Sequence, residues 1–403
     1  MKERVAITGI GVLSAAGSDV ASVWNAIRQG KDGLSTRGRL ENGAPVPGPA
    51  AHVVPGTFAR EGWPTRSVAF AVHCAEQAAS QARLGQLSPA AREATGLVLG
   101  ACTGGMLCTE QYLAARARGV PADLRLLRYH ECCHATDAVA KRLGIGGPRT
   151  TVSTACTSGA VALTTAFDMI RAGEADITVA GGVDTLTLLT LNGFESLLIV
   201  SSEGCRPFDR DRSGMNLGEG GALLVLEREE AARDRGVPVL AWLTGCGSSC
   251  DARHATAPSP DGIHRAMVEA LTQANRSFSE VDYINAHGTG TRDNDQCEAE
   301  AIGRLSQGKP PRVSSTKRYF GHTLAGAGAI EAAVTVLALR HQAFPGNLGC
   351  KTPDPALGIV PVLTTTPGCL RVAMSLSLGF GGANSALVLE YAGQQGEGEV
   401  PTR

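Results

Sequence analysis

The sequence predicts an α/β fold made of two similar halves, and three observations support this prediction. Segments rich in β-branched and aliphatic residues alternate with helical segments along all 403 residues, which is typical of sheets covered by helices. Two short motifs recur: VST at 152–154 returns as VSS at 313–315, and GGALLVLE at 220–227 returns as GGANSALVLE at 381–390. The chain also has 50 glycines, well above the usual share of about 7%, so its backbone must adopt unusual angles or make close approaches at many points.

Both pairs of motifs have the same separation (313 − 152 = 161 and 381 − 220 = 161), which indicates an internal duplication. A recurrence of similar strand–turn chemistry without duplication is the alternative. We expect an N-terminal half at residues 1–235 that carries insertions, a C-terminal half at 236–392 and a disordered tail at 393–403.

Composition excludes several classes of protein. A net charge of −1 argues against nucleic acid as the main partner, because that affinity needs clustered cations. No stretch approaches the ~20 apolar residues of a membrane span, and the N-terminus does not resemble a signal peptide. The 12 cysteines include no C-x-x-C pair, so they predict a reduced, cytoplasmic protein.

Local signals define the first elements in order. VAITGIGVLS at 5–14 predicts a strand that ends in a glycine turn. Ser18 and Asp19 offer an N-cap for a short helix that ends near Gly30. The next expected segments are a surface loop at 35–64, a helix within 65–85 and a buried strand within 95–101.

The strongest candidate for a nucleophile is Cys156, which follows a β-branched run at 150–154 and precedes a helix with almost no connecting loop. Unpaired N–H groups and the dipole at a helix N-terminus favour an anion, so we expect this thiol to ionise more easily than usual. On this segment alone, a buried cysteine that merely fills space is the alternative.

Three further segments each combine a strand with a glycine-rich turn, and they favour the catalytic interpretation. INAHGTGT contains His287, VSSTKRYFGHTLAGAGAIEAAV contains Lys317 and His322, and AMSLSLGFGGANS contains Phe380. A single histidine in such a place is more often structural. Two histidines in similar contexts, together with a cysteine at a strand end, predict one catalytic site at an edge of the sheets.

These motifs make the chain resemble the β-ketoacyl-acyl carrier protein synthases, the condensing enzymes of type II fatty acid and polyketide synthesis. TACTSG resembles the nucleophile motif of the family, HGTGT and STKRYFGH its two histidine motifs, and GFGGAN, PFDRDRSGMNLGEGG and HATAPSPDG its accompanying signatures. The resemblance runs in order from VAITGIG to ALVLE. It implies the thiolase fold, in which duplicated βαβ-type halves form α-β-α-β-α layers.

The resemblance also implies a reaction and the residues that carry it. Cys156 would accept an acyl group from a thioester, and His287 and His322 would donate hydrogen bonds to the enolate oxygen formed when malonyl-acyl carrier protein loses CO₂. The backbone N–H groups of Cys156 and Phe380 would form the oxyanion hole, and Phe380 would also act as a gate. The expected products are 3-oxoacyl-acyl carrier protein and CO₂.

Other positions match the family's supporting residues. Lys317 would set the local charge and orient the second histidine, and Asp295 would have a structural role. The remaining matches are Glu331 in the helix that follows His322, Thr289 and Thr291 along the path of the phosphopantetheine arm, and Thr256 on the malonyl side.

The resemblance implies acyl carrier protein as a partner and a homodimer or a heterodimer with a related chain. It implies no metal, and no cofactor other than the phosphopantetheine of the carrier. An acidic carrier would need a basic patch near the mouth of the site. The candidates for that patch are Arg66, Arg125, Arg128 and Arg206, each of which is otherwise an ordinary solvated arginine.

Two segments imitate metal sites. HECCH at 130–134 fits the H-E-x-x-H zinc pattern, which needs both histidines on one helix. Thr136 and Asp137 predict the start of the following helix, so we expect the motif to lie outside it. Cys246, Cys250 and His254 have helix-like spacing, but their flanks predict strand and loop.

Two alternative functions remain at this stage. A thiolase-like enzyme that uses coenzyme A would need a second cysteine late in the chain, and GFGGAN offers none. A non-catalytic chain-length or scaffold partner of a ketosynthase would not need the cysteine and both histidines. Leu376 and Leu378 depart from the commoner residues of the family, and HGTGTRDND is closer to its polyketide branch.

Overall fold

The structure is a computed structural model that describes residues 4–35, 40, 46, 53–54, 63–306 and 308–393. The expected loop at 35–64 and the expected tail at 393–403 therefore lie almost wholly outside the described residues.

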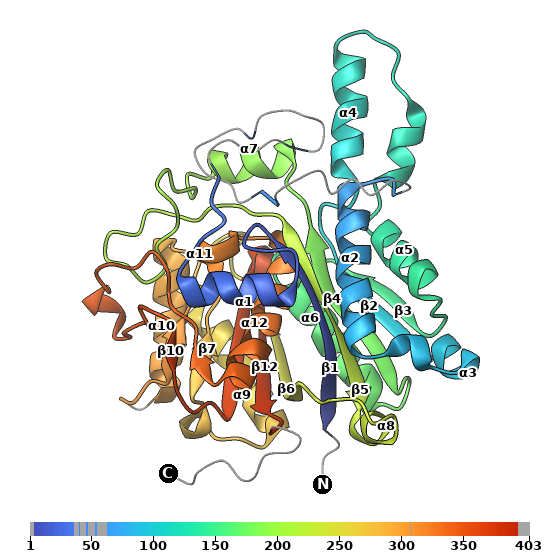
Figure 1. Cartoon of the computed structure of the whole chain (residues 1–403). Coiled ribbons are helices and arrows are strands. Elements are labelled where there is room, and N and C mark those ends of the chain that lie inside the picture. The colour runs from blue at the N-terminus through green and yellow to red at the C-terminus, as the bar shows by residue number, and fades with distance from the viewer. Residues whose placement is uncertain are drawn as a thin grey trace.

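Ten strands form one mixed sheet in the order β3-β2-β4-β5-β1-β6-β12-β11-β7-β8, and β9 pairs with β10 separately (Figure 1). The strands are β1 Val5–Ser14, β2 Gly96–Gly100, β3 Arg149–Val152, β4 Ile177–Asp184, β5 Gly220–Arg228, β6 Ala241–Cys250, β7 Tyr283–Asn285, β8 Arg312–Ser314, β9 Ala343–Phe344, β10 Thr366–Pro367, β11 Val372–Gly379 and β12 Ala383–Tyr391.

This order contains the predicted duplication. Counted inward from each end, β3-β2-β4-β5-β1 and β8-β7-β11-β12-β6 have the same connectivity, so each strand of one half has a counterpart in the other. Within the sheet, residues 5–7 of β1 pair with residues 241–243 of β6 and so join the two halves. The domain boundary that we expect between residues 235 and 236 stays a prediction.

Helices cover both outer faces of the sheet and fill the space between its halves. α2 packs on β1 and β5 and against α5, while α9 packs on β6 and β12 and against α10. α6 and α12 contact strands of both halves and each other, which gives the predicted five layers (Figure 1). The helices are α1 Val20–Gln29, α2 Arg66–Gln81, α3 Pro89–Glu93, α4 Met106–Ala117, α5 Cys133–Leu143, α6 Ser158–Arg171, α7 Leu188–Ser196, α8 Glu229–Asp234, α9 Pro260–Ala274, α10 Arg292–Ser306, α11 Lys317–Phe320 and α12 Ala327–His341.

Short 3₁₀ helices complete the chain: η1 Leu84–Gln86, η2 Leu124–Tyr129, η3 Phe278–Glu280, η4 Leu324–Gly326, η5 Pro355–Leu357 and η6 Phe380–Gly382. The early elements agree with their sequence signals. Asp19 caps α1, which ends at Gly30 in the left-handed conformation, and Thr65 caps α2.

The central helix α12 is apolar on every side because it lies inside the protein. The stretch Leu324–His341 is long and apolar enough to cross a membrane by composition, but 89% of it is buried in the fold. Burial on all faces is what the middle layer of this architecture requires.

Glycines let the two central helices approach closely. A Cβ on Gly159 of α6 would lie 2.6 Å from the carbonyl oxygen of Ala325, and a Cβ on Gly328 of α12 would lie 2.8 Å from Cβ of Ala160. Neither position has room for a side chain, which explains part of the glycine surplus.

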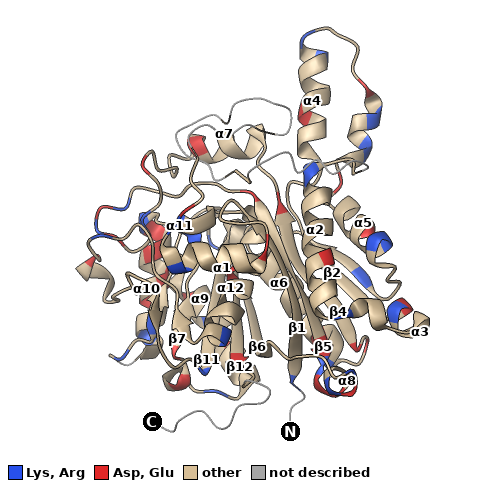
Figure 2. Ribbon diagram, in the orientation of Figure 1, with Lys and Arg blue, Asp and Glu red and all other residues tan. Residues whose placement is uncertain are grey.

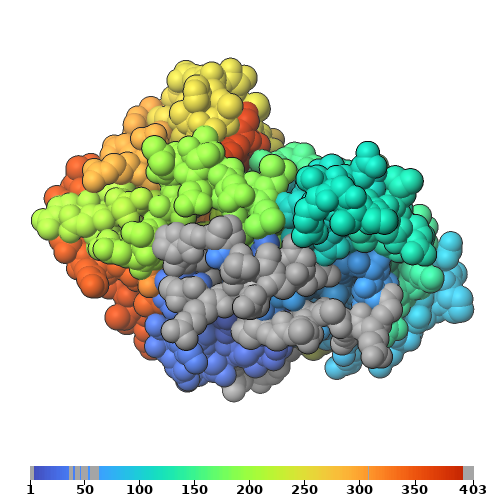
Figure 3. Space-filling view, turned by 90° about the horizontal axis from the view of Figure 1, so that it is seen from above, coloured from blue at the N-terminus to red at the C-terminus, as the bar shows by residue number. Residues whose placement is uncertain are grey.

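The segment formed by α4 and η2 projects from the body of the protein beside α2 and α5 (Figure 1). Seen from above, this segment lies next to the stretch that contains α7 (Figure 3). It exposes Leu113 and Leu124, with 57% and 67% of their surface accessible.

Candidate active site

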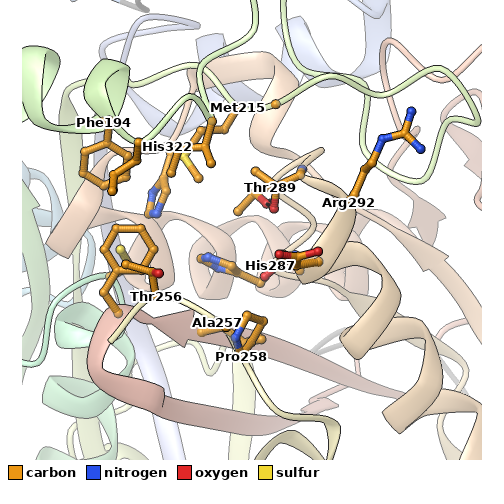
Figure 4. Close-up of a pocket in the computed structure, with 18 of the residues that line it drawn as sticks. Phe194, Met215, Thr256, Ala257, Pro258, His287, Thr289, Arg292 and His322 are labelled. Atoms are coloured by element: carbon orange, nitrogen blue, oxygen red, sulfur yellow. Dashed lines mark hydrogen bonds between the residues drawn. The ribbon is translucent and has the colours of Figure 1, made fainter. Parts of the chain in front are cut away.

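The predicted site residues meet in one cavity of about 550 Å³ (Figure 4). Those that line it are Cys156, Thr256, His287, Thr289, Thr291, His322 and Phe380. Lys317, Glu331 and Asp295 are buried behind this layer. The lining comes from both halves of the chain, as the duplication requires.

Cys156 lies on a tight turn between β3, which ends at Val152, and α6, which begins at Ser158. Ala155 has a φ of 51°, a left-handed conformation that costs a non-glycine residue free energy. The hydroxyl of Ser158 holds this turn, because it accepts the N–H of Thr154 at 2.9 Å and donates to the carbonyl of Ala155 at 2.6 Å.

The ionisation of Cys156 differs from the expectation based on its position. Burial raises the pKa of its thiol to about 11, although the positive charge of Lys317 and the backbone N–H groups of Phe380 and Cys156 lower it. The expectation of easier ionisation was therefore wrong. Desolvation of a thiolate in a closed site outweighs the helix terminus.

The same backbone N–H groups form a candidate oxyanion hole. Those of Phe380 and Cys156 both face the sulfur. The gap between their segments is narrow, because a Cβ on Gly379 would lie 3.3 Å from the backbone nitrogen of Cys156. Glycine at 379 thus lets the Phe380 turn come close enough for both N–H groups to reach one oxygen.

His287 and His322 face each other edge to face, with ring centroids 5.2 Å apart. The Nζ of Lys317 lies 3.2 Å from Nδ1 of His287, and the N–H of Leu324 donates to Nδ1 of His322 at 3.3 Å. Because Nδ1 accepts a hydrogen bond in both rings, the proton of each neutral imidazole is on Nε2.

The hydrogen bond of Lys317 goes to the first histidine, whereas we expected Lys317 to orient the second. Its ammonium bonds to His287 and forms a buried ion pair with Glu331 of α12. Burial lowers the pKa of both histidines well below the usual value, and Lys317 lowers it further. Both imidazoles are therefore neutral donors at neutral pH.

Two buried carboxyls hold the loop that carries His287. Glu298, which the sequence did not point to, accepts the N–H of His287 at 2.6 Å and that of Gly288 at 2.8 Å, and burial raises its pKa to about 8. Asp295 accepts the N–H of Gly290 at 3.1 Å and that of Phe208 at 2.8 Å. Asp295 and Glu298 lie three residues apart in the first turns of α10, and this spacing of two acidic residues was the sequence feature that could have pointed to Glu298.

Phe194 of α7 is a second residue that sequence reasoning missed. Its ring stacks on Phe380 with centroids 5.4 Å apart, and it meets the ring of His322 edge to face at 6.4 Å. Only 4% of the chain is aromatic, so a phenylalanine in the stretch LLTLNGFES was the available signal. Phe194 restrains the ring expected to act as a gate.

The two segments that imitate metal sites have other partners. His130 bonds to Thr109, and His134 bonds to the carbonyl of Arg128. Helix α5 begins at Cys133, so its start is earlier than the expected Thr136, but His130 still lies outside it. Cys246 and Cys250 lie on strand β6. Within the described ranges, no cluster of three or more His, Cys, Asp or Glu side chains is arranged to hold a metal ion.

One of the four arginines considered for a docking patch is excluded by its position. Arg66 is buried and forms an ion pair with Glu219 at 2.6 Å. Arg125 and Arg128 are exposed on η2, and Arg206 is partly exposed beside Glu203. Arg66 therefore stabilises the fold and does not belong to a surface patch.

Comparison with known proteins gives the family. Residues 65–232 match "Beta-ketoacyl synthase, N-terminal domain", and residues 240–351 match "Beta-ketoacyl synthase, C-terminal domain". The chain is 32% identical to nodulation protein E of Rhizobium meliloti (strain 1021), over 97% of this chain and all of that protein. It is 39% identical to 3-oxoacyl-[acyl-carrier-protein] synthase 2 of Mycobacterium bovis, over 68% of each.

Solved structures with a similar fold also belong to ketosynthases. The ishigamide ketosynthase/chain length factor superposes with a TM-score of 0.91 at 31% identity, over 98% of this chain and all of that chain. A type II polyketide ketosynthase in complex with its acyl-carrier protein gives a TM-score of 0.89 at 29% identity, over 97% of this chain and all of that chain. With the cysteine, both histidines and the duplicated fold in place, this chain belongs to the β-ketoacyl synthase family.

Proposed function

We propose that the enzyme condenses an acyl group held on Cys156 with malonyl-acyl carrier protein, and releases CO₂. One observation carries the proposal: two sets of hydrogen-bond donors face the cavity that Cys156 lines. The first set is the two neutral imidazoles, each with its proton on Nε2, and the second is the pair of backbone N–H groups next to the Cys156 sulfur. One set of donors suits a thioester oxyanion and the other suits an enolate.

In the first half-reaction, the sulfur of Cys156 attacks the carbonyl carbon of the acyl thioester. The oxygen becomes an oxyanion that the N–H groups of Cys156 and Phe380 stabilise. The carrier leaves as a thiol and takes up the proton that Cys156 lost. Because the pKa of the free thiol is about 11, this proton leaves only as the sulfur attacks.

In the second half-reaction, the carboxylate of the malonyl thioester leaves as CO₂ and its electron pair forms an enolate. His287 and His322 donate their Nε2 protons in hydrogen bonds to the enolate oxygen, while Lys317 holds Nδ1 of His287. The enolate carbon then attacks the carbonyl of acyl-Cys156. The C–S bond breaks with its electron pair on the Cys156 sulfur, which takes a proton from solvent, and 3-oxoacyl-carrier protein is formed.

We propose that both substrates arrive on the phosphopantetheine arm of an acyl carrier protein. Thr256, Thr289 and Thr291 line the cavity, and Thr289 lies next to His287 (Figure 4), so their hydroxyls can bond the amides of the arm. Basic residues lie on the segment that follows α4 (Figure 2). Arg125 and Arg128 of this segment stay candidates for carrier docking, and a cytoplasmic location stays a prediction.

We propose that β3 joins the chain to a second subunit. It is an end strand of the sheet, with Arg149 and Thr150 exposed. The opposite end strand β8 is covered, because the N–H of Val362 bonds to the carbonyl of Val313 at 2.8 Å. An open edge strand is a template for pairing. Some of the similar structures are ketosynthases with a chain length factor, so the second subunit is either a copy of this chain or such a relative.

The experiment is a condensation assay on the purified chain with acyl- and malonyl-carrier proteins, in which CO₂ and the 3-oxoacyl product are both measured. We expect equal amounts of both from the wild-type chain, and loss of both in His322→Ala. A chain that forms neither product when alone, and none after a partner subunit is added, would instead be a non-catalytic member of the family.

A further inference from the structure

The carboxylate of Asp184 joins two segments on either side of the nucleophile. Asp184 is the last residue of β4 and is fully buried. Its Oδ1 accepts three hydrogen bonds from one segment: the N–H of Cys102 at 3.1 Å, and the N–H and hydroxyl of Thr103 at 2.8 Å each. Its Oδ2 accepts one bond from the other segment, the N–H of Ala325 at 2.9 Å.

The bond to Ala325 leads to the second catalytic histidine. Leu324, which precedes Ala325, has a φ of 52° and donates its N–H to Nδ1 of His322. A leucine in this conformation is strained and needs its neighbours to hold it. Asp184 binds the N–H of Ala325, the residue directly after Leu324. It therefore holds in place the Leu324 N–H that orients His322.

The three bonds on Oδ1 lead to the nucleophile turn. The sulfur of Cys102 lies 3.3 Å from the carbonyl oxygen of Ala155 and 3.2 Å from the hydroxyl of Ser158. These are the groups that hold the strained Ala155 next to Cys156. The two oxygens of one carboxylate therefore reach the supports of Cys156 and of His322.

Resting on the proposed function, we propose that Asp184 is a positioning residue that sets His322 relative to Cys156 for the decarboxylation step. Asp184 does not line the cavity, and it acts through the backbone of Ala325 and Leu324. The turn at Ala325 is also tightly packed. A Cβ would lie only 2.4 Å from the carbonyl oxygen of Ala325 if it were added to Gly182, and 2.6 Å if it were added to Gly159.

The substitution Asp184→Asn separates the two sets of bonds: the nucleophile arm, which is the three bonds on Oδ1, and the histidine arm, which is the bond from Oδ2 to Ala325. Three donors face Oδ1, so the amide oxygen must take that place, and the NH₂ group of the asparagine then faces the N–H of Ala325. Two donors in contact cannot bond. The variant therefore keeps the nucleophile arm and loses the histidine arm, in a side chain of almost unchanged volume.

The test compares two rates in Asp184→Asn: transfer of an acyl group from acyl-carrier protein to Cys156, and release of CO₂ from malonyl-carrier protein. We expect CO₂ release to fall at least about tenfold, as loss of a bond to a buried charge would cause, and acyl transfer to stay within about twofold. Asp168→Asn, which removes an exposed acid from α6, is the control and should change neither rate.

Equal loss of both rates in folded Asp184→Asn, or loss of neither, would overturn the proposal. If this variant does not fold, Thr103→Val offers the converse test: it removes one of the three bonds on Oδ1 and keeps the bond to Ala325. Acyl transfer should then fall more than CO₂ release, and a larger fall in CO₂ release would overturn the proposal. A wild-type chain that transfers acyl groups but releases no CO₂ would contradict the proposed function itself, and not only the role of Asp184.

Discussion

At the level of single residues, the chemistry depends on how charge is distributed around Cys156. Burial raises the pKa of the thiol, while Lys317 and two backbone N–H groups lower it. Burial keeps His287 and His322 neutral, and Lys317 adds to this effect, so that each ring donates its Nε2 proton in a hydrogen bond. One buried cation thus favours sulfur attack and enolate stabilisation together.

The first prediction concerns the protonation of this thiol. Alkylation of Cys156 by iodoacetamide should accelerate about tenfold per pH unit between about pH 7 and 10, because the thiolate fraction follows a pKa of about 11. Mass spectrometry of the peptide that contains Cys156 measures the rate without interference from the other cysteines. A plateau already at about pH 8 would show that the thiol is activated in the resting enzyme.

At the level of elements, the site depends on the crossing of α6 and α12. Each helix begins beside a catalytic group, Cys156 before α6 and His322 before α12. Gly159 and Gly328 bring the two helix starts together, so the separation of nucleophile and histidine depends on backbone packing. Glycine is required here by space and not by an unusual φ.

The second prediction uses this crossing. Gly159→Ala should destabilise the protein by about 1–3 kcal/mol, because its Cβ would overlap the carbonyl of Ala325. Gly303→Ala in α10 is the matched control: a Cβ there meets nothing within 4 Å, so better helix propensity should stabilise the protein by up to about 1 kcal/mol. Urea unfolding measures both. Shifts of the same sign would contradict the packing argument.

At the level of the whole molecule, the duplication brings distant residues to one place. The repeated motifs predicted the two halves, and the strand–turn motifs predicted which residues line the cavity. The burial of Arg66 against Glu219, which is 153 residues away, could not be read from the sequence, because no local pattern encodes that pairing. The pKa of Cys156 was predicted with the wrong sign for the same reason, since desolvation sums over all surrounding atoms.

The third prediction is a dependence of stability on pH. Burial lowers the pKa of His287 and His322 in the folded protein, so between about pH 7 and 5 only the unfolded chain takes up protons on them. The free energy of unfolding should therefore fall on acidification. Each histidine contributes a fall of up to about 1.4 kcal/mol for each pH unit.

Comparison with His287→Asn/His322→Asn isolates this effect. Glu298 and Glu331, whose pKa is raised to about 8 and about 7, act in the opposite direction over this range in both proteins. The wild type should lose more stability than the double variant between about pH 7 and 5, as measured by urea unfolding. Equal losses would mean that the histidines are charged in the folded state.

The central claim is that Cys156 carries the acyl group, and intact-protein and peptide mass spectrometry after incubation with acyl-carrier protein tests it most directly. The wild-type chain should gain the mass of one acyl group on the peptide that contains Cys156, and Cys156→Ala should gain none. Acylation that persists in Cys156→Ala, or that is found on another cysteine of the wild type, would contradict the account.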